Sequence, residues 1–284
     1  MKAVFKNVAI LGLGLIGGSI ALELKKRRLA QRVVGYNRSA PSRRAALRLG
    51  ACDAVFEDSR QAVKDADLVI LATPVRSIPE LATQIAPYLK VGALVTDVGS
   101  TKAALVKAAA KALPKHAVFI GGHPIAGTEN TGMASAELDL FQNRWWVLTP
   151  PQGKKSQALS RLTRWVKDLG AKPVSMSPEA HDRILGAVSH LPHVLAYALI
   201  HAVAKDSGGK ALKFAGRSFR DVTRIAASSP DMWVDIALDN RGPLLDWLKK
   251  YEKVLVGIRR GIAAGDAKKL RTFFAEGAGL RRKL

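Results

Sequence analysis

Short apolar runs that alternate with helical patterns are the feature of this sequence that most limits its possible folds. Up to about residue 177 the runs are VAIL, RVVGY, LVILATP, ALVTDVG, VFIGG, WWVLTP and KPVSMS. Short buried strands separated by helices are typical of a mostly parallel sheet with helices on both faces. We therefore predict a doubly wound α/β domain over residues 1–177.

The alternation stops after Ser177, and from Pro178 onward the spacing is helical throughout. The expected helices are Glu179 to about Asp206, Arg217 to Ala227, Met232 to Asn240, Pro243 to Gly265 and Ala267 to Ala275. At 284 residues the chain is also longer than one core usually supports. We predict a second, all-helical domain over residues 178–284.

The formal charge of +22 at pH 7 raises the question of nucleic-acid binding. Because the excess of Lys and Arg is spread over both halves, we expect a basic surface that attracts anionic small molecules instead. The single cysteine, Cys52, suits a reducing cytoplasm, since it cannot form an internal disulfide. We expect no membrane span, because the most apolar stretch, Gly186 to Val203, carries three histidines.

A glycine-rich turn, GLGLIGG, follows the first predicted strand and opens a helix expected over Ser19 to Lys26. Its GxGxxG spacing permits a tight turn, close approach of the backbone to a pyrophosphate, and close packing of helix on strand. The helix N-terminus then offers amide hydrogens to the phosphates. The first strand-to-helix turn of an alternating pattern is where Rossmann-type domains bind dinucleotides. The predicted cofactor residues here are Gly12, Gly14, Leu15, Ile16 and Gly17.

The end of the second predicted strand bears on the choice between NAD and NADP. NAD-binding proteins usually place an acid there, whereas this chain has Asn37, Arg38 and Ser39. Arg38 can bind a 2′-phosphate through its guanidinium fork, and Ser39 can donate a further bond. We predict these three residues at the cofactor and NADP as the preferred form, with NAD possible. The alternative is that Arg38 merely lies across the adenine.

Two more strand ends are expected at the same edge of the sheet. LATPV carries Thr73 and Pro74, and TDVGSTK carries Asp97 and Ser100. Doubly wound sheets bind ligands at the carboxyl ends of their strands, so we predict Thr73, Pro74 and Asp97 near the cofactor. For Asp97 and Ser100 the alternative is a helix cap.

The stretch GGHPIAGTENTG places His123 between two glycines and Pro124. Proline disfavours the helical region for the residue before it, and glycines release the backbone. We therefore expect His123 to be displayed on a turn at the ligand-binding edge. Thr128 and Asn130, in the following loop, are further possible contacts.

Several motifs together resemble the prephenate and arogenate dehydrogenases of tyrosine biosynthesis. They are GLGLIGG, DVGSTK, GGHPIAGTENTG, SHLPH and FRDVTRIAASSPDMW, in order between about residues 7 and 250. The resemblance implies a dinucleotide-binding domain joined to a helical dimerisation domain, and so a homodimer. It also implies hydride transfer from a cyclohexadienol ring carbon to NAD or NADP while the ring loses carbon dioxide.

The resemblance assigns two residues to the chemistry. His123 matches the family's catalytic histidine, and a neutral imidazole bonded to the substrate hydroxyl can take up its proton as hydride leaves. Ser100 matches the active-site serine and would bond the same hydroxyl or His123.

Further residues in the helical part match substrate contacts of the family. Arg224 would bind a substrate carboxylate, and Arg220, one turn earlier, is a candidate second contact. In SHLPH, Ser189 and His193 are expected near the substrate, and the second histidine favours prephenate over arogenate. Trp233 matches a residue near the substrate, with ordinary packing as its alternative.

His190 and His193 are three residues apart, but no third ligand at a useful spacing accompanies them, so we predict no metal. A core histidine with one hydrogen bond is the other interpretation of His190. Pro192 should loosen the hydrogen bonding of this helix.

The sequence departs from the family where the acid after the second strand is missing, and where AGRSFRD has Arg217 and Ser218 in place of glycine-rich sequence. Two other function classes stay open at this point. One is a beta-hydroxyacid dehydrogenase related to 6-phosphogluconate dehydrogenase, which normally uses a catalytic lysine that the helical region lacks. The other is a non-catalytic module that senses NADP or binds nucleic acid, which leaves His123, Ser100 and Arg224 unexplained.

Overall fold

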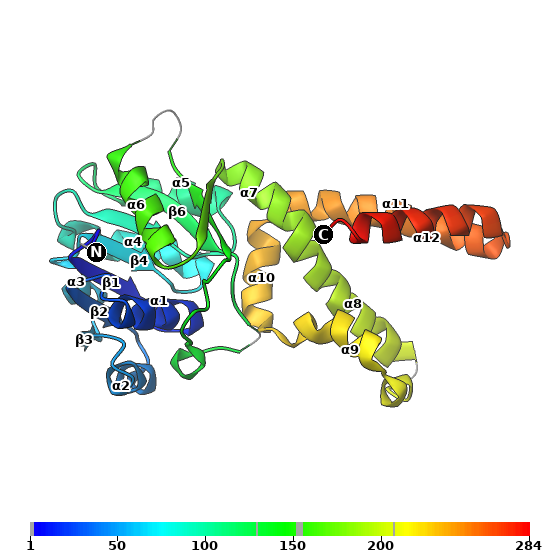
Figure 1. The fold of residues 1–284 in the computed structure, drawn as a ribbon, viewed down its shortest axis with the longest axis horizontal. Coiled ribbons are helices and arrows are strands. Elements are labelled where there is room, and N and C mark those ends of the chain that lie inside the picture. The colour runs from blue at the N-terminus through cyan, green and yellow to red at the C-terminus, as the bar shows by residue number, and fades with distance from the viewer. Residues whose placement is uncertain (1–2, 129, 152–155, 207) are drawn as a thin grey trace.

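The computed structural model describes residues 3–128, 130–151, 156–206 and 208–284. A sheet flanked by helices forms one end of the molecule, and helices alone form the other (Figure 1). This is the predicted fold class, an α/β doubly wound sheet followed by an all-helical region.

The described residues build one eight-stranded sheet in the order β3-β2-β1-β4-β5-β6-β7-β8. Only β6 and β7 pair antiparallel; the other neighbours are parallel. The strands are β1 (Asn7–Leu11), β2 (Arg32–Tyr36), β3 (Ala54–Phe56), β4 (Leu68–Leu71), β5 (Leu94–Asp97), β6 (Val118–Pro124), β7 (Trp145–Thr149) and β8 (Lys172–Ser175). The sequence analysis missed β3, whose three residues are too few to show a pattern.

Helices cover both faces of this sheet, and each face has its own apolar core. Ile10 and Leu24 belong to one cluster, while Leu11 and Ile85 belong to the other. Successive strand residues point to opposite faces, which is why Ile10 and Leu11 separate. The helices are α1 (Leu15–Lys26), α2 (Ala40–Arg48) and α6 (Gln157–Asp168) on the first cluster, and α3 (Ser59–Val63), α4 (Ile78–Ile85) and α5 (Ala103–Ala112) on the second.

The helical region follows the predicted order of segments. Its helices are α7 (Pro178–Leu185), α8 (Leu191–Asp206), α9 (Arg217–Thr223), α10 (Pro230–Asp239), α11 (Arg241–Ala263) and α12 (Ala267–Arg281). Figure 1 shows α11 and α12 projecting from the body as a long pair, while α10 stands beside the sheet region. Arg76, just after β4, and Asp239 of α10 join the two regions through an ion pair of 3.5 Å.

A π turn, Gly186–His190, connects α7 to α8 without a break in the helical run. It ends two residues before Pro192, whose ring excludes the carbonyl four residues earlier and so produces the predicted loosening. The joined run, Pro178–Asp206, is long and apolar enough by length and composition to cross a membrane, so the argument from its histidines was wrong, while the expectation of no span stays a prediction. Its histidines do not count as charged, and the mean hydropathy of its most apolar stretch is 1.4. One such helix is weak evidence of a span.

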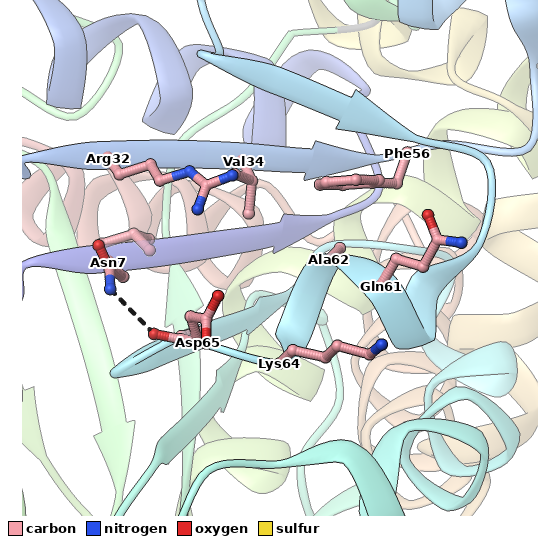
Figure 2. A pocket seen from close by; sticks show the side chains of 10 residues that line it. Asn7, Arg32, Val34, Phe56, Gln61, Ala62, Lys64 and Asp65 are labelled. Carbon is pink, nitrogen blue, oxygen red and sulfur yellow. Dashed lines mark hydrogen bonds between the residues drawn. The ribbon is translucent and has the colours of Figure 1, made fainter.

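A pocket beside α3 extends from the first residues of β1 and β2 to Phe56, the last residue of β3 (Figure 2). Asn7 and Arg32, the first residues of β1 and β2, line it together with Lys64 and Asp65. Asn7 donates to the Asp65 carbonyl at 3.1 Å. This pocket is separate from the strand ends that carry the predicted site residues.

Candidate active site

His123 lies within strand β6, where it pairs with Val147 of β7. The expectation of a turn was therefore wrong. The preceding glycines serve close packing: a Cβ on Gly122 would lie 2.6 Å from the Asp97 main-chain oxygen. The Gly122 amide donates to Asp97 Oδ1 at 3.0 Å. Packing against β5 and pairing with β7 thus hold His123 on rigid backbone, with its side chain half-buried.

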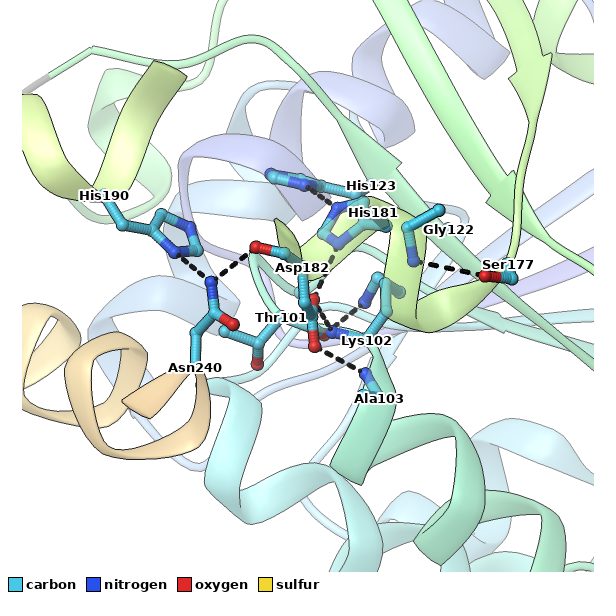
Figure 3. A network of polar contacts seen from close by, with 12 residues as sticks. Thr101, Lys102, Ala103, Gly122, His123, Ser177, His181, Asp182, His190 and Asn240 are labelled. Carbon is cyan, nitrogen blue, oxygen red and sulfur yellow. Dashed lines mark hydrogen bonds and ion pairs between the residues drawn. The ribbon is translucent and has the colours of Figure 1, made fainter. Parts of the chain in front are cut away.

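Three side chains form a line that begins at His123 and crosses into the helical region (Figure 3). His123 Nδ1 lies 2.8 Å from His181 Nε2, and His181 Nδ1 lies 2.8 Å from Asp182 Oδ1. His181 and Asp182 are on α7 and are buried. The sequence analysis missed both. The adjacent His and Asp at the start of the first helix after the sheet region were the signal available.

The ionisation state of Asp182 determines which nitrogen of each histidine carries a proton. Burial by itself raises the pKa of Asp182, but hydrogen bonds from His181 and from the Ala103 and Lys102 amides outweigh it and lower that pKa. The ionised carboxylate only accepts, so His181 donates from Nδ1 and, when neutral, accepts at Nε2. His123 must then donate from Nδ1. A neutral His123 consequently carries its lone pair on Nε2.

Burial is the main reason that both histidines are neutral. It lowers the pKa of His123 well below 6.5, and the nearby His181 and the Lys102 charge add to the effect. Burial also lowers the pKa of His181, although its bond to Asp182 opposes the change. Neutral imidazole is the form that can accept a proton.

Asp182 also caps the N-terminus of a helix in the sheet region. Its two carboxylate oxygens accept from the main-chain amides of Lys102 and Ala103, each at 2.8 Å, where α5 begins. A carboxylate at a helix N-terminus satisfies free amides and complements the dipole. Neither Asp97 nor Ser100 caps α5, so that alternative from the sequence is wrong.

Asp97 is fully buried, and its carboxylate is occupied within the protein. It accepts from the amides of Gly99 at 2.8 Å and Gly122 at 3.0 Å, and it pairs with the fully buried Lys102 ammonium. This arrangement disagrees with the predicted cofactor contact, because no part of the carboxylate is exposed. Asp97 instead joins β5 to β6 behind His123.

The glycine turn has the geometry that a dinucleotide pyrophosphate requires. Gly12 has φ +110°, and a Cβ there would lie 2.5 Å from the Ala72 carbonyl oxygen. A Cβ on Gly17 would lie 2.0 Å from the Gly12 oxygen, so α1 packs directly on the turn. Gly14 faces open space at the N-terminus of α1. The three glycines therefore fit their predicted uses, and the residues present fit a dinucleotide.

Two apolar residues complete this turn. Leu15, the first residue of α1, is buried. The helix begins four residues earlier than predicted. Ile16 is partly buried, and its Cδ1 lies 4.0 Å from where a Cβ on Gly127 would be. Ile16 therefore connects the glycine turn to the loop that follows His123.

The residues after β2 form an exposed turn. Asn37 Oδ1 accepts from the Ser39 amide at 2.9 Å, and Ser39 Oγ accepts from the Ser42 amide at 3.4 Å as the N-cap of α2. The Arg43 guanidinium donates to the Arg38 carbonyl at 2.8 Å. Arg38 and Ser39 are both exposed beside a helix N-terminus, an arrangement that suits a phosphate.

Thr73 and Pro74 follow β4, next to the glycine turn through Ala72. Ser77 Oγ donates to the Pro74 carbonyl at 2.7 Å and lies 3.0 Å from Thr73 Oγ1. Thr73 is partly buried and Pro74 exposed. Both lie at the predicted edge.

Among the predicted substrate residues, His193 contacts Ser189 and Trp233, whereas Arg220 is exposed. His193 stacks on Trp233, with ring centroids 3.9 Å apart, and its Nδ1 lies 2.8 Å from the Ser189 carbonyl. Burial lowers the pKa of His193, and the Arg224 charge lowers it further, which places Arg224 nearby. Arg220 is exposed, and its guanidinium is directed back to the Ala215 carbonyl at 3.1 Å.

The two histidines considered as a metal pair have separate partners. His190 Nδ1 lies 2.8 Å from Asn240 Nδ2, while His193 bonds Ser189. Across the described part of the chain, no group of three or more His, Cys, Asp or Glu residues is placed to hold a metal ion.

Known protein families match nearly the whole chain. The family "Prephenate dehydrogenase, nucleotide-binding domain" matches residues 20–175, and "Prephenate dehydrogenase, dimerization domain" matches residues 177–276. The chain is 39% identical over 277 residues to a prephenate dehydrogenase of Bacillus subtilis, covering 96% of this chain and 75% of that protein. It is also 39% identical to a cyclohexadienyl dehydrogenase of Zymomonas mobilis, covering 96% and 94%.

A solved structure is similar over the same extent. The prephenate dehydrogenase of Aquifex aeolicus, crystallised with hydroxyphenyl propionate and NAD+, superposes with a TM-score of 0.92 at 34% identity. The superposition covers 98% of each chain.

Proposed function

The chain belongs to the prephenate dehydrogenase family, and from that premise we propose how its own residues carry out the reaction. The protein is an NAD(P)-dependent oxidoreductase that decarboxylates prephenate, or arogenate, as it oxidises it. One observation carries our assignment of roles. The line from His123 through His181 to Asp182 ends in a neutral imidazole at the edge of the sheet that bears the glycine turn.

His123 is the general base in this proposal. As hydride leaves the ring carbon, positive charge develops there and the attached hydroxyl loses its proton to His123 Nε2. The bond from His123 Nδ1 to His181 strengthens as the ring becomes positive, and Asp182 stabilises that charge through His181. A nicotinamide held at the glycine turn would supply the acceptor for the hydride, and the ring would release carbon dioxide as it becomes aromatic. Ser100 would orient the same hydroxyl.

The residues that hold the cofactor are the glycine turn, Thr73 and Pro74 on one side, and Asn37, Arg38 and Ser39 on the other. We propose NADP as the preferred form. Two exposed groups, the Arg38 guanidinium and the Ser39 hydroxyl, lie at the N-terminus of α2 with no carboxylate among the three residues that follow β2. A 2′-phosphate there would gain charge-assisted hydrogen bonds.

The helical region supplies the cationic partner of the anionic substrate. Arg224 would bind a carboxylate, with His193 and Trp233 forming one wall and Arg220 in reach of the entrance. The histidine at position 193 supports prephenate as the preferred substrate, because prephenate has a keto acid side chain where arogenate carries an ammonium group.

We further propose that the protein acts as a cytoplasmic homodimer. Large apolar side chains are exposed on α11 and α12, including Ile262 at 62%, Phe274 at 59% and Leu280 at 67%. A second copy packed on these helices would bury them. The matched dimerization domain supports this arrangement.

Formation of reduced cofactor tests the function directly. Absorbance is followed with prephenate or arogenate, each with NADP or NAD. We expect the highest kcat/KM with prephenate and NADP. No turnover in any of the four combinations would contradict the activity, and a preference for NAD would contradict only the assignment of Arg38 and Ser39.

A further inference from the structure

Asn240 occupies a junction between the helical region and the active site. It is the residue before α11, where asparagine commonly caps the helix, yet its side chain makes no cap bond. The buried side chain is directed to α7 and the π turn instead. Its Nδ2 donates to the Asp182 carbonyl at 2.8 Å and lies 2.8 Å from His190 Nδ1 (Figure 3).

The two contacts of Asn240 determine where His190 carries its proton. A main-chain carbonyl can only accept, so the amide atom that faces Asp182 must be the nitrogen. The same nitrogen donates its second hydrogen to His190, and His190 Nδ1 must therefore be unprotonated. Neutral His190 then carries its proton on Nε2. Burial, which lowers the pKa of His190 to about 4, keeps the ring in this neutral form.

The protonated nitrogen of His190 lies in the neighbourhood of Ser100. Its Nε2 is buried and has no hydrogen-bond partner among the described residues. The main chain of Ser100 is nevertheless close enough to raise the pKa of the ring against the effect of burial. The same ring meets Trp233 edge-on, with centroids 6.1 Å apart. A buried donor without a partner is costly, so a contact between His190 Nε2–H and the main chain of Ser100 would stabilise the ring in this tautomer.

The backbone geometry of this segment is consistent with such a use. His190 is the last residue of the π turn, and that turn begins at Gly186. A Cβ on Gly186 would lie 3.3 Å from Asn240 Nδ2, so a larger residue would press on the amide. Single π turns occur frequently at functional sites, where they redirect a side chain.

We propose that His190 is a positioning residue whose Nε2–H donates to the main chain of Ser100 and so directs the Ser100 hydroxyl, with Asn240 holding His190 in the required tautomer. The inference rests on the proposed function, since it gives Ser100 a partner. Asn240 would then control both catalytic groups. It reaches His123 through Asp182 and His181, and Ser100 through His190.

Two substitutions of His190 separate its two nitrogens. His190→Gln can place an amide donor near the position of Nε2, whereas His190→Asn retains a group near Nδ1 and loses the donor. We expect His190→Asn to lower kcat about tenfold, the effect of one lost hydrogen bond, while His190→Gln stays within about twofold of the wild type. Equal losses in the two variants would overturn the proposal.

A double-substitution cycle distinguishes positioning from general destabilisation. In a Ser100→Ala background, His190→Asn should change kcat by much less than in the wild type, because the directed hydroxyl is gone. The same fold loss in both backgrounds would show a merely structural role. Wild-type turnover serves as the reference, so an inactive wild type would refute the proposed function and not this contact.

The tautomer is measurable without any variant activity. Long-range ¹H–¹⁵N correlation spectra of the labelled wild-type protein should show His190 neutral with its proton on Nε2, assigned by the peak that His190→Gln removes. A proton on Nδ1, or a charged ring at neutral pH, would overturn the proposal even if the variants are inactive.

Discussion

The sheet region and the helical region of this protein bury their side chains in different ways. Both apolar core clusters of the described structure lie before residue 172. In the helical region the buried residues include His181, Asp182, His190 and Asn240, all near the junction. The far helices, α11 and α12, expose large apolar side chains. The sheet region thus has its own core, whereas the helical region is organised around a polar junction and an uncovered apolar surface.

This difference divides the chemistry between the regions. In our proposal the sheet region holds the cofactor turn and the general base on rigid strands, and the helical region holds the groups that orient that base and bind the substrate. Substitutions of site residues in the sheet region should therefore affect mainly kcat or cofactor binding. In the helical region, substitutions of the substrate-binding groups should raise mainly KM, whereas substitutions of the groups that orient His123 or Ser100 should lower kcat or the stability of the junction.

Substitution of His123 should have the largest effect. His123→Asn removes the general base, and we expect kcat to fall by about 10² to 10⁴ while KM for the substrate changes little. Steady-state kinetics with both substrates varied measures this separation. Because burial lowers the pKa of His123 below 6.5, the acid limb of wild-type kcat/KM should lie below pH 6.5. A variant with unchanged kcat would remove the catalytic role.

Substitution of Arg224 tests substrate binding by the helical region. Arg224→Ala should raise KM for prephenate about 10- to 100-fold, since a charge-assisted hydrogen bond contributes about 1.5 to 3 kcal/mol, with a small change in kcat. Arg224→Lys should recover part of the loss because it restores charge without the planar fork. Arg164→Ala, an exposed arginine on α6, is the matched control. A fall in kcat at constant KM would place Arg224 in the chemistry instead.

Cofactor choice gives a smaller effect within the sheet region. Arg38→Ala should raise KM for NADP about tenfold and leave KM for NAD nearly unchanged, because only NADP has the 2′-phosphate. Arg48→Ala, in the last turn of α2, the helix that follows Arg38, controls for the loss of one positive charge. Equal changes for both cofactors would indicate that Arg38 lies across the adenine.

The smallest expected change concerns the pH dependence of stability at the junction. The folded-state pKa of Asp182 is lowered below 3.8, so its contribution to the free energy of unfolding is present above the unfolded pKa. That contribution is lost as pH falls through the lower, folded pKa. Urea unfolding should therefore show Asp182→Asn less stable than the wild type at neutral pH, with the difference shrinking in acid. A difference independent of pH would mean that the charge of Asp182 is unimportant.

Much of the architecture could be predicted from the sequence because the interactions that determine it are local. Apolar periodicity predicted the strands and helices, and the glycine spacing predicted the turn before α1. Each of these depends on the backbone geometry of a few adjacent residues. Where local signal was weak, as in the short β3, the prediction failed. His123 was a related error, because proline and glycine allow a turn but do not require one.

The sequence by itself also determined which residue types were available for the chemistry, through motifs that resemble a known family. Only the tertiary structure decided how they meet. His123 and His181 are 58 residues apart, and Lys102 and Asp182 are 80 apart. Such contacts form only when two regions with separate patterns dock, and no local periodicity records them. The same reason explains the places of two carboxylates. Asp97, which the sequence suggested as a cofactor ligand or a helix cap, lies buried next to His123, and Asp182 caps the N-terminus of a helix of the sheet region.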